Sequence, residues 1–136
     1  MSHLLDTSAW LAHLFGEPGV EEVSRIFEDA QSEVFVSVLS LPEMYGRLKA
    51  LDRQDQWPLV RDTYAELFAR VLPVDESIAA AAIDFRSRAQ PRLPTIDALI
   101  AATARVHGLI LVHRDPHLAA ISSENLAQVS LPGKQA

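Results

Sequence analysis

Two patterns of apolar residues alternate along this chain. Short runs that are almost entirely apolar predict β-strands, and longer stretches with apolar residues three or four positions apart predict α-helices. The predicted strands cover residues 3–5, 34–38, 71–74, 109–112 and 126–129. The predicted helices cover residues 8–15, 20–30, 40–51, 58–71, 75–90 and 95–107, and a turn or short helix begins at residue 115.

Individual residues indicate where several of these helices begin and end. Ser40 is suited to cap a helix, and Pro42 suits its first turn. Asp75 can cap the helix that runs to about Gln90, and Gly108 ends the one before the fourth strand. The spacing of apolar residues predicts inward-facing sets on two helices: Val60, Tyr64, Leu67 and Val71 on one, and Ile96, Leu99, Ile100, Thr103 and Val106 on the other.

The order of these elements predicts the fold class. Strands that alternate with helices favour an α/β fold, a three-layer α/β/α sandwich with a central, mainly parallel sheet and right-handed crossovers. The run 109–112 is apolar throughout, as expected of a parallel strand that is buried on both faces. Pro73 places the third strand at an edge of the sheet. We expect one domain over residues 1–131 and a flexible tail over 132–136.

Composition narrows the possible function classes. The chain has 136 residues, 49% of them hydrophobic, and it contains no cysteine, which excludes disulfides and thiolate metal sites. The start of the sequence lacks the pattern of a secretory signal, and no apolar run is long enough for a membrane helix. A soluble cytoplasmic protein with no membrane association is therefore expected. A net charge of −6 argues against binding bulk nucleic acid, although the carboxylates of a metal-dependent nuclease would themselves contribute to it.

Four acidic residues stand at the ends of predicted strands or at the starts of helices close to them: Asp6, Glu43, Asp97 and Asp115. In a parallel sheet the carboxyl ends of the strands lie at one edge, where α/β proteins bind ligands. Four carboxylates at one edge would repel one another, and a divalent cation would relieve that repulsion. The sequence therefore predicts a site for Mg²⁺ or Mn²⁺, which would suit hydrolysis of a phosphodiester bond.

Each acid also has a purely structural interpretation. Asp6 could cap a helix, and Asp115 precedes a proline, which is common in turns. Glu43 lies three residues after Ser40, the spacing of a capping box, or it could pair with Arg47 one turn later. Asp97 lies in a first turn, where the helix dipole favours a negative charge. It is also the only charged residue between Arg92 and Arg105, which favours a functional role.

The same stretches resemble the PIN domain, and specifically the VapC-type toxins of bacterial toxin–antitoxin pairs. The matching segments are LDTS at 5–8, SVLSLPE at 37–43, PTIDALIAATA at 94–104 and LVHRD at 111–115. Their order and spacing cover nearly the whole chain. The resemblance implies a PIN-like α/β/α sandwich and a Mg²⁺- or Mn²⁺-dependent endoribonuclease that cuts RNA. It also implies a homodimer that a cognate antitoxin holds inactive.

The resemblance assigns roles to the four acids. Asp6 and Asp97 correspond to direct metal ligands, and Glu43 and Asp115 complete the catalytic metal site directly or through water. Thr7 or Ser8 could orient a ligand or a metal-bound water.

This chain departs from the family pattern on both sides of Asp115. His113 stands where the family usually has threonine or serine, and Leu118 where an aromatic residue is common. His113 and His117 could touch phosphate or metal, but the simpler interpretation is that both are surface histidines on a polar loop.

Other residues and functions were weighed alongside this interpretation. Four arginines near the predicted site could bind RNA phosphates or simply face solvent: Arg86, Arg88, Arg92 and Arg114. Trp10 and Trp57 fit a core or an interface. The alternative function is a PIN scaffold with little catalysis that binds RNA or an antitoxin-like protein, although the retention of four acids argues against it. The sequence lacks a phosphate-binding P-loop motif and the paired aspartates of receiver domains and phosphatases.

Overall fold

The computed structural model describes residues 1–88 and 92–133. Within these residues five strands form one sheet in the order β3-β2-β1-β4-β5, and every pairing is parallel. The strands are β1 (His3–Leu5), β2 (Val34–Ser37), β3 (Arg70–Leu72), β4 (Ile110–His113) and β5 (Gln128–Ser130). The predicted parallel sheet is therefore confirmed, with β3 at one edge as its proline suggested.

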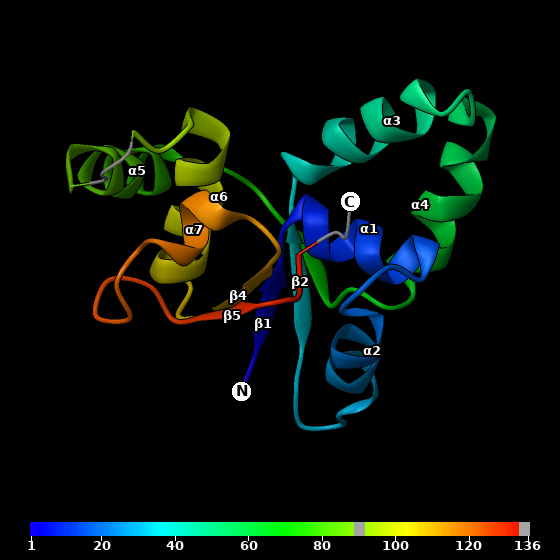
Figure 1. Cartoon of the computed structure of the whole chain (residues 1–136), viewed down its shortest axis with the longest axis horizontal. Coiled ribbons are helices and arrows are strands. Elements are labelled where there is room, and N and C mark those ends of the chain that lie inside the picture. The colour runs from blue at the N-terminus through cyan, green and yellow to red at the C-terminus, as the bar shows by residue number, and fades with distance from the viewer. Residues whose placement is uncertain (89–91, 134–136) are drawn as a thin grey trace.

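Helices cover both faces of this sheet. They are α1 (Thr7–Phe15), α2 (Val20–Glu28), α3 (Ser40–Ala50), α4 (Trp57–Ala65), α5 (Glu76–Arg88), α6 (Thr95–Val106) and α7 (Pro116–Ala119), with a 3₁₀ turn η1 (Gln54–Gln56) before α4. Figure 1 shows α5, α6 and α7 on one side of the strands and α1 to α4 on the other. The predicted three-layer α/β/α sandwich is confirmed.

Alternation along the central strands joins the sheet to both helical layers. Leu4 and Leu111 pack into an apolar cluster with α5 and α6. Their neighbours Leu5 and Val112 pack into a second cluster with Trp10 of α1. Successive side chains of a strand point to opposite faces, so a strand of three residues can contact two cores. This explains why even the short strand β1 carries two consecutive apolar residues, Leu4 and Leu5.

Two predicted inward-facing sets are only partly correct. Val60 and Tyr64 are buried, but Leu67 is 43% exposed and Val71 is 39% exposed, because α4 ends at Ala65 and Val71 belongs to β3. On α6 the prediction is confirmed for Ile100 and Thr103, which are buried, and four alanines are buried with them: Ala98, Ala101, Ala102 and Ala104. Ile96 and Val106 are more than a third exposed. Small residues on this face let α6 approach the neighbouring elements closely.

The role predicted for Ser40 as a helix cap is wrong. Helix α3 begins at Ser40 itself, Leu39 occupies the cap position, and no side chain caps that end. Ser40 is buried and its hydroxyl lies 3.0 Å from the Thr7 hydroxyl. Asp75, in contrast, does cap α5, since its carboxylate accepts a hydrogen bond from the Ile78 amide.

Two other expectations lie partly or wholly outside the described residues. Helix α5 is described as far as Arg88, so its predicted continuation to Gln90 lies outside them. Of the predicted tail, residues 134–136 also lie outside. Among the residues that the structure does describe, no helix is long and apolar enough to cross a membrane.

Two glycines, one before α2 and one inside α3, offer a matched test of packing. Gly19 has a φ of +99°, and a Cβ there would lie 3.0 Å from the Cβ of Leu131. Gly46 lies inside α3, and a Cβ there would meet nothing within 4 Å. We expect Gly19→Ala to destabilise the protein by roughly 1–3 kcal/mol through strain and overpacking. Gly46→Ala should stabilise it by roughly 0.5–1 kcal/mol.

Urea unfolding of the two variants and the wild type measures both effects. Equal midpoints for Gly19→Ala and the wild type would contradict the close contact with Leu131.

Candidate metal centre

Asp6 follows β1 and caps helix α1. Its Oδ1 accepts hydrogen bonds from the Ala9 amide at 2.9 Å and from the Ser8 hydroxyl at 2.6 Å. The structural interpretation of this residue is therefore correct, but both bonds use one oxygen, and no hydrogen bond from the described residues uses Oδ2. Burial raises the pKa of Asp6 to about 6, against the opposing effect of these two donors. The residue thus keeps one carboxylate oxygen available to a ligand.

Glu43 lies in the first turn of α3, which follows β2. Its Oε1 accepts a hydrogen bond of 2.7 Å from the hydroxyl of Thr7 at the start of α1. The described residues contain no capping bond from Ser40 at this helix end and no ion pair between Glu43 and Arg47. Neither structural interpretation of Glu43 is therefore found; the glutamate is instead joined to the residue after Asp6.

Asp97 lies in the first turn of α6, and its pKa depends on the charges of all three other acids. Its pKa is raised to about 7, first by burial and then by the negative charge of Asp115, with smaller effects from Asp6 and Glu43. The negative charges of the other three predicted acids, which come from three separate parts of the chain, therefore act on Asp97. Of the four acids, only Asp97 and Asp115 belong to the close group of possible metal ligands among the described residues. Without a cation, one way to relieve this repulsion is for Asp97 to hold a proton near neutral pH.

Asp115 follows β4 and caps α7 through its Oδ1, which accepts a 2.8 Å hydrogen bond from the His117 amide. The Nδ1 atom of His117 lies 3.2 Å from the same oxygen. Asp97, Asp115 and His117 each offer one ligand atom, and these atoms lie within 4.8 Å of one another. Such spacing is compatible with one shared cation.

His113 is not the surface histidine that we predicted. It is completely buried on β4, where its Nδ1 accepts a 3.0 Å hydrogen bond from the Asp115 amide. The proton therefore lies on Nε2, which is 2.7 Å from Oε1 of Gln128 on β5. With both ring nitrogens engaged, His113 positions the Asp115 backbone and does not bind a metal. Its place two residues after the inward-facing Leu111 is a signal that could have predicted this burial.

Ser8 links this group of acids to a buried arginine, a contact that sequence reasoning missed. The Ser8 hydroxyl donates to Asp6 and accepts the Arg114 amide at 2.9 Å. The Arg114 guanidinium forms a 2.8 Å ion pair with Glu17 and is only 7% exposed.

The other arginines considered in the sequence lie beside α5 and α6. Arg86 donates to the Thr95 hydroxyl at the start of α6, and Arg88 pairs with Asp84. Arg92 is exposed.

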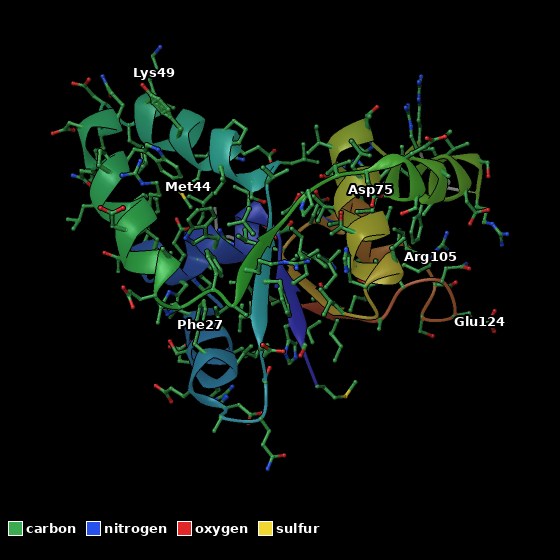
Figure 2. All side chains as sticks on the ribbon, turned by 180° about the vertical axis from the view of Figure 1, so that it is seen from behind. Phe27, Met44, Lys49, Asp75, Arg105 and Glu124 are labelled. Carbon is green, nitrogen blue, oxygen red and sulfur yellow. The ribbon has the colours of Figure 1, made fainter. Side chains whose placement is uncertain are left out.

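Figure 2 shows side chains filling the space between the helices on each side of the sheet. In agreement with the sequence interpretation, Trp10 is buried and contacts the rings of Trp57, Tyr64 and Phe68.

Comparisons with known proteins agree with this fold. A family model described as the PIN domain matches residues 3–124. No curated protein sequence matches the chain. Among solved structures, FitAcB from Neisseria gonorrhoeae is 29% identical, with 94% of this chain and 96% of that chain covered and a TM-score of 0.68.

Two further structures share the fold at lower identity. VapBC2 from Rickettsia felis, bound to a DNA fragment from its promoter, is 15% identical over 96% of this chain and 98% of that chain, with a TM-score of 0.76. VapC20 from Mycobacterium tuberculosis, described as a toxin that cleaves the sarcin-ricin loop, is 20% identical over 88% of this chain and 95% of that chain, with a TM-score of 0.66.

The raised pKa of Asp97 predicts how stability changes with pH when divalent cations are absent. A carboxyl with a pKa of about 7 in the folded state binds its proton more tightly there than in the unfolded chain. The free energy of unfolding should therefore fall as the pH rises from about 4 to about 7. Asp6 should add to this fall up to a pH of about 6.

Asp97→Asn tests this prediction, because it removes the charge while keeping the shape. In EDTA at pH 8 we expect its Tm to exceed that of the wild type by roughly 2–4 °C. Asp55→Asn, at an exposed aspartate of η1, is the matched control and should leave the pH profile unchanged. Parallel thermal melting profiles for Asp97→Asn and the wild type between pH 4 and 8 would contradict the prediction.

Proposed function

The chain belongs to the PIN domain family, and we propose that it is a metal-dependent endoribonuclease, the toxin of a toxin–antitoxin pair. The observation that carries this proposal is the convergence of Asp6, Glu43, Asp97 and Asp115, expressed in the pKa of Asp97, which is raised to about 7. A protein gains nothing in stability by gathering like charges, so their proximity favours a bound cation.

The chemistry of the donors favours Mg²⁺ or Mn²⁺. The four acids offer carboxylate oxygens, the ligand type that both ions prefer. Asp6, Asp97 and Asp115 would hold the ion, with Glu43 completing the site directly or through water. His117 is 46% exposed beside Asp115 and could contact either the ion or a substrate phosphate. A bound divalent ion supplies an activated water and stabilises the oxygen that leaves the phosphorus atom.

The residues around the acids hold them in place for this chemistry. Thr7 donates to Glu43, and Ser8 donates to Asp6, so two consecutive hydroxyls orient two carboxylates. The His113 ring accepts the Asp115 amide and so orients the backbone at the third. Asp97 must give up its proton when the ion binds, because a metal ligand is deprotonated.

The solved structures support the biological role. FitAB, which is 27% identical with a TM-score of 0.75, is described as bound to a DNA fragment. Another similar structure is described as a toxin–antitoxin complex from Klebsiella pneumoniae, at 23% identity and a TM-score of 0.68. We therefore propose RNA as the substrate, a cognate antitoxin as the inhibitory partner, a homodimer as the assembly, and the cytoplasm as the location.

Cleavage of an RNA pool by the purified, antitoxin-free protein tests the enzyme activity. We expect cleavage with Mg²⁺ or Mn²⁺ and none with excess EDTA. Asp97→Asn should lower the rate by roughly 100-fold or more, since even residues that only support metal ligands contribute about 10- to 100-fold. Asp55→Asn should cut at the wild-type rate, and circular dichroism should show both variants folded.

Two results would contradict the proposal in different ways. Wild-type cleavage by Asp97→Asn would show that the site is assigned wrongly. If the wild type cuts no RNA with any metal and binds no Mg²⁺, the binding scaffold replaces the enzyme.

The proton on Asp97 predicts a pH-dependent affinity for the ion. Mg²⁺ should bind more tightly as the pH rises through about 6 to 7, by up to about tenfold per pH unit, and should release protons on binding. Isothermal titration calorimetry in two buffers of different ionisation enthalpy counts those protons. An affinity that stays constant between pH 5.5 and 8 would argue against these carboxyls as ligands.

A further inference from the structure

A cavity of about 480 Å³ lies beside the candidate metal centre without including its four acids. Its walls come from α1, from the end of α3 and from the segment after β4. The residues that matter here are Ser8, Phe15, Arg47, Leu51, Arg53 and Arg114. Ser8 therefore lies on the wall of this cavity and also donates to Asp6 at the metal centre.

The cavity concentrates positive charge on a protein whose net charge is −6. Three arginines and one glutamate, Glu17, contribute to its lining. Glu17 pairs with Arg114, whereas Arg47 and Arg53 form no ion pair with any residue that the structure describes. Both are exposed at the cavity. Their charges are thus available to an anion.

Arg114 gives the cavity a rigid, buried element. Its side chain is 7% exposed and is held by Glu17 at 2.8 Å and by the Ser8 carbonyl at 3.2 Å. Its Nη1 atom is buried and has no hydrogen-bond partner among the described residues. A buried donor without an acceptor is costly, and an oxygen of a bound anion would satisfy it. Because the guanidinium is already fixed, binding would order little that is not ordered in the free protein.

An apolar wall faces the same space as the arginines. The Arg53 guanidinium lies over the face of Phe15, with its Cζ atom 5.9 Å from the centre of the Phe15 ring. Leu51 is 55% exposed. Flat guanidinium and aromatic surfaces are the surfaces on which the bases of single-stranded nucleic acid stack. The cavity thus combines donors for a phosphate with a surface for a base.

We propose that this cavity binds a phosphate group of the RNA strand next to the bond that is cut, with Arg47, Arg53 and Arg114 as its donors. The adjoining base lies against Phe15 and Leu51. The assignment rests on the proposed ribonuclease function, and it names the side of the metal centre along which the strand runs. An acidic segment of a protein partner is the competing occupant that the experiment must exclude.

The test measures RNA binding without cleavage. A fluorescently labelled single-stranded RNA of mixed sequence is titrated with protein in EDTA at several NaCl concentrations. The variants are Arg47→Gln with Arg53→Gln, and the control Arg25→Gln, an exposed arginine of α2 that lines a separate pocket with His3 and Asp29. The double variant should bind roughly 10-fold more weakly, and its logarithmic salt dependence should be shallower by about 0.7, the value for one lost phosphate contact on a single strand. The control should match the wild type in both.

Free phosphate and RNA phosphate are separated by competition. Adenosine monophosphate and inorganic phosphate are added to the wild-type complex. The proposal expects millimolar competition by the nucleotide and weaker competition by phosphate alone, because only the nucleotide carries a base. Displacement by inorganic phosphate as effective as that by the nucleotide would overturn the part assigned to Phe15 and Leu51.

Failure of this proposal can be distinguished from failure of the ribonuclease function. If the wild type cuts RNA with Mg²⁺ but the double variant binds RNA with unchanged affinity and salt dependence, the cavity assignment is overturned and the nuclease stands. If binding depends on the two arginines but no metal supports cleavage, the nuclease is overturned and the phosphate site stands. If the double variant loses affinity for the antitoxin alone, or if the wild type binds no RNA, the cavity assignment is overturned.

Discussion

Repulsion between carboxylates is the constraint on which the rest of this site depends. A parallel sheet brings the ends of β1, β2 and β4 to one edge, and the sequence places an acid just after each of them or in the helix that follows. Asp97 at the start of α6 adds a fourth charge. The fold must stabilise this arrangement in the free protein, and it does so with donors from the same edge. Ser8 and the Ala9 amide bond Asp6, Thr7 bonds Glu43, and the His117 amide bonds Asp115.

These donors explain why the structural and functional interpretations of the acids are not alternatives. Asp6 and Asp115 each cap a helix through one oxygen. A cap fixes the rotamer of the carboxylate and leaves its other oxygen available, so the bond that stabilises the helix is compatible with the proposed role as a metal ligand. A residue can therefore appear ordinary in local sequence context and still serve a site that several elements share.

The layers, the strand direction and the position of the acids could be predicted from the sequence because they follow from periodicity and chain order. Leu4 and Leu5 illustrate this, since adjacent apolar residues on so short a strand require a core on each face.

The contacts that depend on which side chains meet could not be predicted in this way. Glu43 bonds Thr7, a residue 36 positions earlier, instead of capping its own helix, and Arg114 is buried against Glu17 across the fold. His113 was predicted on the surface because the strand was predicted to end at residue 112 and a polar loop to follow, whereas β4 continues through His113, which lies on the same face as Leu111. Local pattern determines the elements, whereas the partners of a polar side chain depend on the finished packing.

The order of the strands in the sheet has a consequence for the timing of synthesis. Strand β1 lies between β2 and β4, and Asp115 follows Asp6 by 109 positions along the chain. A nascent chain holds Asp6 and Glu43 long before β4 can pair with β1, and no local fragment contains the four acids. Long-range pairing of this kind forms late in folding. A ribosome therefore completes most of this polypeptide before the four acids can meet, and the site stays incomplete until β4 docks against β1.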